Sequence, residues 1–177
     1  KLEKPHFGDT ELQPNVRLLW TPNGSNSLWL AASRASRTPS RGETESRVAV
    51  AFLQPTANPS GLPLQVVTVP NPDLVAEKLT AYEVGYRALL TNRLSLDIAA
   101  FSNRYRDQSQ WNVGTLQLAS APVSHVYRPL SYINAETTTK TRGIEIVADW
   151  RPLDWIRLEA SHTWLRVNAP PPDGVNT

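Results

Sequence analysis

Few side chains in this sequence have the type and spacing that catalysis requires. The carboxylates that could act as an acid–base pair all fall where polar and apolar residues alternate: Asp97, Glu145, Asp149 and Glu159. The cations that share this alternation are Arg17, Arg87 and Arg157. We expect the carboxylates to form solvated ion pairs with these arginines, because exposed opposite charges on one strand face lie within reach of each other.

Nucleophilic and metal chemistry have even less support. Ser161 and His162 are adjacent, but neighbouring residues of a β-strand point to opposite faces, so this serine cannot use this histidine as its base. The chain has no cysteine, its three histidines are scattered, and it lacks a glycine-rich phosphate loop. We therefore expect no enzymatic activity, no cofactor and no metal site.

The segments that would position these residues alternate with period two and show almost no helical pattern. They predict six strands, at about 12–20, 27–37, 78–90, 94–107, 133–150 and 155–167. In the strand cores one face is apolar and uncharged, as in Leu94, Leu96, Ile98 and Ala100, whereas the opposite face carries the charges. One side of the sheet should therefore contact an apolar environment and the other side water.

Short and long connections alternate along the chain. Tight turns join the strands in pairs, whereas the connections at about 38–77 and 108–132 are long. Long connections are uncommon in compact soluble domains, but turns at one end and long loops at the other are typical of outer-membrane β-barrels. Most of the strands also exceed the roughly 5–6 residues usual in globular proteins, and they suit a tilted membrane crossing of about 9–11 residues.

Aromatic residues gather at both ends of the predicted strands. Those near the tight turns are Trp20, Trp29, Trp150 and Trp155, and those toward the long loops are Tyr105, Trp111, Tyr127, Tyr132 and Trp164. Two such belts are found at the two interfaces of a membrane. Tryptophans that cap the core of a β-sandwich explain the Trp positions equally well, and the asymmetry of the loops favours the membrane.

Composition excludes some partners. The 177 residues contain 18 Lys and Arg against 16 Asp and Glu, a net charge of +2, which is too small an excess to indicate a nucleic-acid surface. The longest uncharged stretch, Val48–Pro72, carries several prolines, which exclude a membrane-spanning helix there.

Five segments, in order, resemble strands of TonB-dependent outer-membrane receptors. They are Glu11–Pro22 (ELQPNVRLLWTP), Ser33–Ser40 (SRASRTPS), Glu77–Arg87 (EKLTAYEVGYR), Leu94–Asn103 (LSLDIAAFSN) and Thr141–Glu145 (TRGIE). Each motif alone is mainly alternation and turn chemistry, and the ordered set is more specific.

The resemblance implies an all-β fold, an antiparallel up-and-down meander of about six long strands that forms part of a 22-stranded transmembrane β-barrel. We expect the chain to be a barrel segment that runs from one extracellular loop to another, with the plug, the TonB box and the C-terminal strand outside it. The family lies in the outer membrane of Gram-negative bacteria. Its members import a scarce nutrient, commonly a ferric siderophore, with energy that the TonB complex delivers through the plug.

Ligand contacts, on this interpretation, belong to the long loops and the outer ends of the strands. Arg34, Arg37 and Arg41 could attract an anionic ferric chelate, although lipopolysaccharide contact or plain solvation explains them too. Tyr105, Trp111 and Tyr127 could stack on an aromatic chelator, or could serve as belt and loop-packing residues.

Two other classes remain open at this point. An outer-membrane barrel hydrolase would need a serine and a histidine on the same face at the strand ends, and we find no such pair. A soluble β-sandwich that binds or adheres would need a second sheet over the apolar face.

Overall fold

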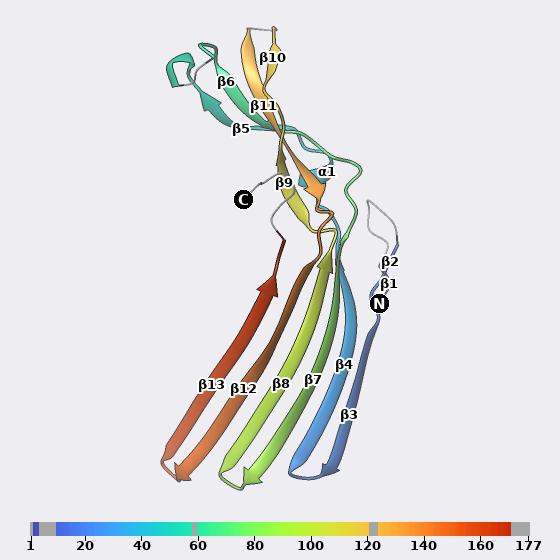
Figure 1. Cartoon of the computed structure of the whole chain (residues 1–177), viewed down its shortest axis with the longest axis vertical. Helices are drawn as coiled ribbons and strands as arrows, with labels where there is room; N and C mark the ends of the chain where they lie inside the picture. The colour runs from blue at the N-terminus through green and yellow to red at the C-terminus, as the bar shows by residue number, and fades with distance from the viewer. Residues whose placement is uncertain (1, 4–9, 58–59, 121–123, 171–177) are drawn as a thin grey trace.

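Two β-sheets account for most of the chain in a computed structural model, which describes residues 2–3, 10–57, 60–120 and 124–170 (Figure 1). The larger sheet has six strands in the order β13-β12-β8-β7-β4-β3, and each neighbouring pair is antiparallel. Its strands are β3 (Asn15–Asn23), β4 (Asn26–Arg37), β7 (Glu77–Thr91), β8 (Leu94–Arg106), β12 (Thr139–Leu153) and β13 (Ile156–Asn168). Neighbours in this sheet follow one another in its chain order, which confirms the predicted meander.

Three tight turns close the same end of the six-stranded sheet (Figure 1). In the first, Asn23 Oδ1 accepts hydrogen bonds from the amide of Ser25 at 3.0 Å and from Asn26 Nδ2 at 2.8 Å. The second and third turns are joined to each other, because Arg93 donates to Asp154 Oδ1 at 2.7 Å and to the Pro152 carbonyl at 3.2 Å. Asparagine favours such turns because its side chain can bond the backbone amide two residues on, as Asn23 does with Ser25.

The second sheet is built from the two long connections. It contains β5 (Val48–Leu53), β6 (Leu64–Thr68), β9 (Ser109–Val113), β10 (Gln117–Ala119) and β11 (His125–Asn134). The strand order is β10-β11-β6-β5, with β9 also paired to β11, and β6 pairs with β11 in parallel. Figure 1 shows this sheet beyond the end of the six-stranded sheet that lies opposite the tight turns. The long loops predicted by the sequence are therefore largely folded.

The remaining elements are short. They are β1 (Leu2–Glu3) and β2 (Glu11–Leu12), which pair with each other, the helix α1 (Arg41–Thr44) and the 3₁₀ turn η1 (Pro55–Ala57). Over the described residues, no helical stretch has the length and hydropathy that a membrane-crossing helix requires.

Two strand starts differ from the expectation. The first strand was expected from residue 12, but Leu12 belongs to β2 and β3 begins at Asn15, after Pro14, which has no amide hydrogen for a ladder. The fifth strand was expected from residue 133, but Ile133 and Asn134 end β11, and β12 begins at Thr139. In both places the two successive strands alternate with period two, so alternation alone does not show where one strand ends and the next, in a different sheet, begins.

The register lines up the predicted apolar residues in continuous rows across all six strands. One row consists of Leu18, Leu30, Val84, Ala100, Ile144 and Trp164. The next residue along each strand belongs to the opposite face, which carries Arg87 and Asp97 as direct partners. The division into an apolar face and a polar face is confirmed.

No second layer covers the apolar face in the described part of the chain. Leu18 is 63% exposed, Leu158 50% and Ile146 38%. The sandwich hypothesis is therefore wrong, because it requires these side chains to be sealed against another sheet. An exposed apolar surface of this extent fits contact with lipid.

Trp29 departs from the predicted aromatic belt. Its register partners Leu19 and Gly85 lie on the polar face, and its indole Nε1 donates to Glu83 Oε1 at 2.7 Å. The ring lies directly over Gly85, where an added Cβ would be only 1.8 Å from Trp29 Cζ2. Proximity to a turn thus misassigned Trp29, whereas Trp20 and Trp150 do lie on the apolar face.

Candidate functional site

The polar face of the six-stranded sheet is largely neutralised by its own side chains. Arg87 Nε donates to Asp97 Oδ2 at 2.7 Å, and Arg157 Nε donates to Asp149 Oδ2 at 2.6 Å. Both ion pairs agree with the sequence expectation. Arg17 does not: its guanidinium lies 6.0 Å from the ring centre of Trp29, a cation–π geometry. Asp97 and Asp149 are therefore each held by an arginine.

Ser161 and His162 lie on opposite faces, as alternation requires. Ser161 pairs with Val147 on the polar face and His162 with Ile146 on the apolar face. His162 is the middle residue of β13 rather than a residue near its loop end. Among the described residues, no group of three or more histidine and carboxylate side chains is placed to hold a metal ion.

Arg37, the last residue of β4, is the centre of an ion-pair cluster at the outer end of the sheet. Its guanidinium lies 3.2 Å from Glu43 of α1 and 2.6 Å from Glu77 of β7. Ser109, the first residue of β9, donates its amide and its hydroxyl to the same Glu77 carboxylate at 2.8 and 2.7 Å. The Arg37 cluster (Arg37, Glu43, Glu77, Ser109) therefore ties the six-stranded sheet to the start of both long connections.

The electrostatics of the Arg37 cluster favour its charged form. Burial by itself would raise the pKa of Glu77, but the hydrogen bonds from Arg37 and Ser109 outweigh it and lower the pKa to about 2. Burial also opposes ionisation of Glu43, and the backbone amide of Ser40 together with Arg37 holds the pKa of Glu43 below its usual range. The two carboxylates in turn raise the pKa of Arg37. The charge of Arg37 is thus largely compensated before any ligand arrives.

The other two candidate arginines lie in different places. Arg34 is on the same face of β4 as Leu30 and Ala32, with Nη2 3.8 Å from a Glu11 carboxylate oxygen. Arg41 is the first residue of α1, is 75% exposed along its side chain, and donates to Glu45 at 3.0 Å. Of the three cations, Arg41 remains the most accessible to a soluble anion.

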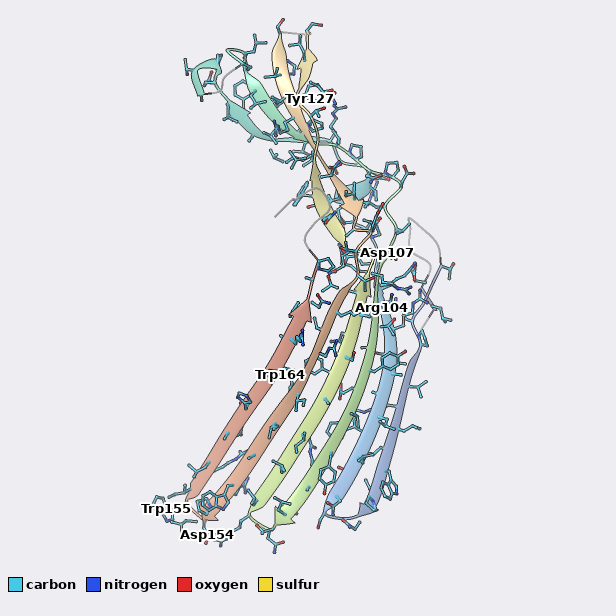
Figure 2. The ribbon with its side chains drawn as sticks, in the orientation of Figure 1. Arg104, Asp107, Tyr127, Asp154, Trp155 and Trp164 are labelled. Atoms are coloured by element: carbon cyan, nitrogen blue, oxygen red, sulfur yellow. The ribbon has the colours of Figure 1, made fainter. Side chains whose placement is uncertain are left out.

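The candidate aromatic residues also separate. Tyr105 shares a pocket of about 230 Å³ with Arg37, Glu77 and Gln108. Trp111 of β9 stacks against Tyr132 of β11 with ring centres 3.9 Å apart, and half of Trp111 stays exposed. The hydroxyl of Tyr127 donates to Gln117 of the neighbouring strand β10, and Figure 2 shows Tyr127 in the small sheet, well beyond the six-stranded sheet. Of the six candidates, Arg37 and Tyr105 thus line the same pocket.

Sequence reasoning missed the residues that organise this end of the molecule. Glu43 carries a recognisable signal, since Ser40 and Glu43 form an S-x-x-E capping box in which the Glu43 carboxylate accepts from the Ser40 amide at 2.7 Å. Asn134 has no such signal: its amide side chain bonds both the amide and the carbonyl of Val75, at 2.9 and 3.0 Å. That contact joins segments far apart in the chain, so no local pattern predicts it.

Comparison with known proteins gives a family match over nearly the whole chain. Residues 3–177 match the family described as TonB dependent receptor-like, beta-barrel. Among curated protein sequences none matches.

Solved structures of similar fold include siderophore receptors and a hemophore receptor. The siderophore receptor PirA from Pseudomonas aeruginosa superposes with a TM-score of 0.68 at 16% identity, over 91% of this chain and 29% of that one. PirA from Acinetobacter baumannii gives a TM-score of 0.66 at 14% identity, over 90% of this chain and 23% of that one. The hemophore receptor HasR from Serratia marcescens, solved with its hemophore and heme, gives a TM-score of 0.65 at 18% identity, over 89% of this chain and 22% of that one. The chain thus spans between a fifth and a third of the length of these receptors, and the likeness establishes the fold.

Proposed function

Because the chain belongs to the TonB-dependent receptor β-barrel family, we propose that the protein containing it imports a ferric siderophore across the outer membrane with energy from TonB. Barrels of this family lie in the outer membrane of Gram-negative bacteria and serve transport rather than catalysis. The ligand, the plug and the TonB contact belong to the whole receptor and are part of the proposal.

The observation that carries the proposal is the family match together with the polar, charge-compensated face of the six-stranded sheet, beyond which lies the folded small sheet. A polar lumen is typical of outer-membrane barrels. The small sheet presents Trp111 and Tyr132 as an aromatic stack, and the exposed Arg41 lies at the start of α1 on the first long connection. Aromatic faces and an accessible cation suit an anionic chelate that contains aromatic rings.

The proposal is tested on the full-length receptor in cells that lack other iron receptors. Three probes are compared: a ferric catecholate, a ferric hydroxamate and haem. We expect one of the two siderophores to bind with at least about tenfold preference over haem, and its uptake to stop when an uncoupler removes the proton-motive force. Binding that persists while uptake stops supports energised import. Uptake that continues in the uncoupler would overturn the transport mechanism, and binding of haem alone would overturn the siderophore assignment.

A matched pair of variants tests the place of binding. Trp111→Ala should weaken binding of the preferred chelate by about tenfold, the scale of about 1–3 kcal/mol for an aromatic stack. Trp155→Ala, at a tight turn on the opposite end and 81% exposed, should leave binding unchanged. Equal effects of both variants would exclude Trp111 as a contact.

A further inference from the structure

Seven cations lie on the lipid-facing side of the six-stranded sheet, just beyond the apolar rows. Each stands an even number of residues from an apolar-face residue on its own strand, as Arg142 does from Ile144 and Arg166 from Trp164. We call them the cationic band: Arg34, Lys78, Arg104, Arg106, Lys140, Arg142 and Arg166.

The cationic band contains three like-charged pairs that face each other directly across neighbouring strands. They are Lys78 with Arg106, Arg104 with Lys140, and Arg142 with Arg166. Side chains at such positions have Cβ atoms about 4.5–5.5 Å apart, and like charges there oppose pairing of the strands. Because this repulsion occurs at three pairs on one face, we expect an anion to lie between the paired cations.

The protein itself supplies few of those anions. Lys78 lies 3.8 Å from Asp107, and Arg34 lies 3.8 Å from Glu11. The other five members of the band are exposed, and none of them has a carboxylate partner within the described residues. Arg34 Nε is buried and likewise has no acceptor among the described groups.

An apolar hollow adjoins the cationic band on the same face. It has a volume of about 480 Å³, and small side chains at Ala32 and Ala100 leave space between Leu18, Leu30 and Val84. Two members of the band follow the rim of the hollow by two residues, Arg34 after Ala32 and Arg104 after Ser102. Cations and hollow thus present adjacent sites for a phosphate and for an acyl chain.

The distance of the cationic band from the tight turns places it at the outward-facing interface of the membrane. The distance along the strand from Trp155, at a tight turn, to Arg166 is about 36 Å, at about 3.3 Å per residue. For a strand tilted by about 40°, this length spans about 28 Å along the membrane normal. An outer-membrane barrel has an apolar band about 25 Å tall. Figure 2 shows Trp155 at the tight-turn end, Trp164 part-way along β13 and Arg104 near the far end of the sheet.

We propose that the cationic band and the adjoining hollow bind a phosphorylated glycolipid of the outer leaflet. Its phosphates lie between the like-charged pairs and relieve their repulsion, and one acyl chain occupies the hollow. The proposal depends on the place of the barrel in the membrane and not on the nutrient that the receptor imports.

The test uses the full-length receptor and compares Arg104→Gln/Arg142→Gln with a matched double variant, Arg47→Gln/Arg128→Gln, whose arginines lie outside the band. Each protein is reconstituted in phosphatidylcholine vesicles with or without bis-phosphorylated lipid A, and the thermal unfolding midpoint and the retained lipid A are measured. We expect lipid A to raise the midpoint of the wild type and of the matched variant. The band variant should show no such rise and should retain at least about threefold less lipid A.

The stability of the band variant without lipid A provides a second test. In phosphatidylcholine alone the band variant should be at least as stable as the wild type, because two like-charged pairs have been relieved. Dephosphorylated lipid A or free inorganic phosphate should not reproduce the stabilisation. The proposal is overturned if the band variant retains lipid A like the wild type, if the matched variant loses as much, or if inorganic phosphate alone gives the full effect.

Discussion

Gly85 shows how a single missing side chain shapes the inner face. The indole of Trp29 occupies the space that a Cβ at residue 85 would need, and from there it reaches Glu83. Gly143 repeats the arrangement with the ring of Phe101, its direct partner on β8, 2.7 Å from the position of an added Cβ. Aromatic rings laid over strand glycines restore packing that glycine cannot supply.

Gly85→Ala should therefore destabilise the barrel by about 1–3 kcal/mol, the usual cost of forcing extra atoms into a packed site. Trp29 must leave its position and lose the hydrogen bond to Glu83, so urea unfolding of the full-length receptor, followed by tryptophan fluorescence, should shift to lower urea. Gly24→Ala is the matched control, since nothing lies within 4 Å of an added Cβ there. A shift as large for Gly24→Ala would contradict the explanation.

The stability that the Arg37 cluster provides should depend on pH. Glu77 has its pKa lowered from 4.5 to about 2, so its contribution is complete above about pH 4.5 and is lost as the pH falls toward 2. At about 1.4 kcal/mol per pKa unit, and with the Arg37 side chain half exposed, we expect about 1–2 kcal/mol after screening by solvent.

Glu77→Gln should accordingly speed amide hydrogen exchange in α1 and β9 by about tenfold between pH 5 and 8, after correction for intrinsic rates. The difference from the wild type should vanish near pH 2, where the wild-type carboxylate is also protonated. Glu45→Gln, which removes only the exposed partner of Arg41, should change neither segment. A Glu77→Gln effect that persists undiminished at pH 2 would show that charge is not its cause.

Among the elements, the parallel pairing of β6 with β11 joins two connections that are separated in the chain by β7 and β8. Val67 lies in this pairing opposite Pro129 and is 7% exposed, whereas Val50 on the outer strand β5 is 54% exposed. The small sheet therefore depends on contacts from both connections at once.

Val67→Asp should open β6 and β11 together, because a buried unpaired carboxylate is strongly disfavoured. Hydrogen exchange should rise at least about tenfold in both strands, while Val50→Asp should leave β11 protected. Faster exchange confined to β6 would mean that the two connections fold independently.

The same scale shows what the sequence could and could not predict. Alternation places Leu30 and Val84 on one face reliably, since a slip of one residue would turn every side chain of a strand over. Alternation also separates Arg34 from Arg37, three residues apart, although grouping them as neighbouring cations hid this difference. The pairing of β6 with β11 was out of reach, because short parallel strands joined across a long stretch of chain leave no local periodic signal.

For the whole molecule, the decisive property is which face contacts lipid. Ile146 and Val147 are adjacent on β12 and almost equally exposed, 38% and 37%, but they point to the apolar and the polar face respectively. They form a matched pair in which only the surroundings differ.

Ile146→Arg should destabilise the full-length receptor in phospholipid vesicles, lowering its free energy of unfolding by about 2–4 kcal/mol, as expected for a cation near the bilayer centre. Val147→Arg should cost about 0–1 kcal/mol, because its side chain meets the watery interior next to Asp97. Reversible urea titrations in vesicles measure both values. Equal costs would contradict the assignment of the faces.

The union of β6 and β11 also limits how such receptors can exchange specificity. A chimera that receives only one of the two long connections would place a foreign strand against a native one and lose the shared ladder. Productive grafts, whether engineered or recombined in nature, should carry both connections together with the hairpin between them.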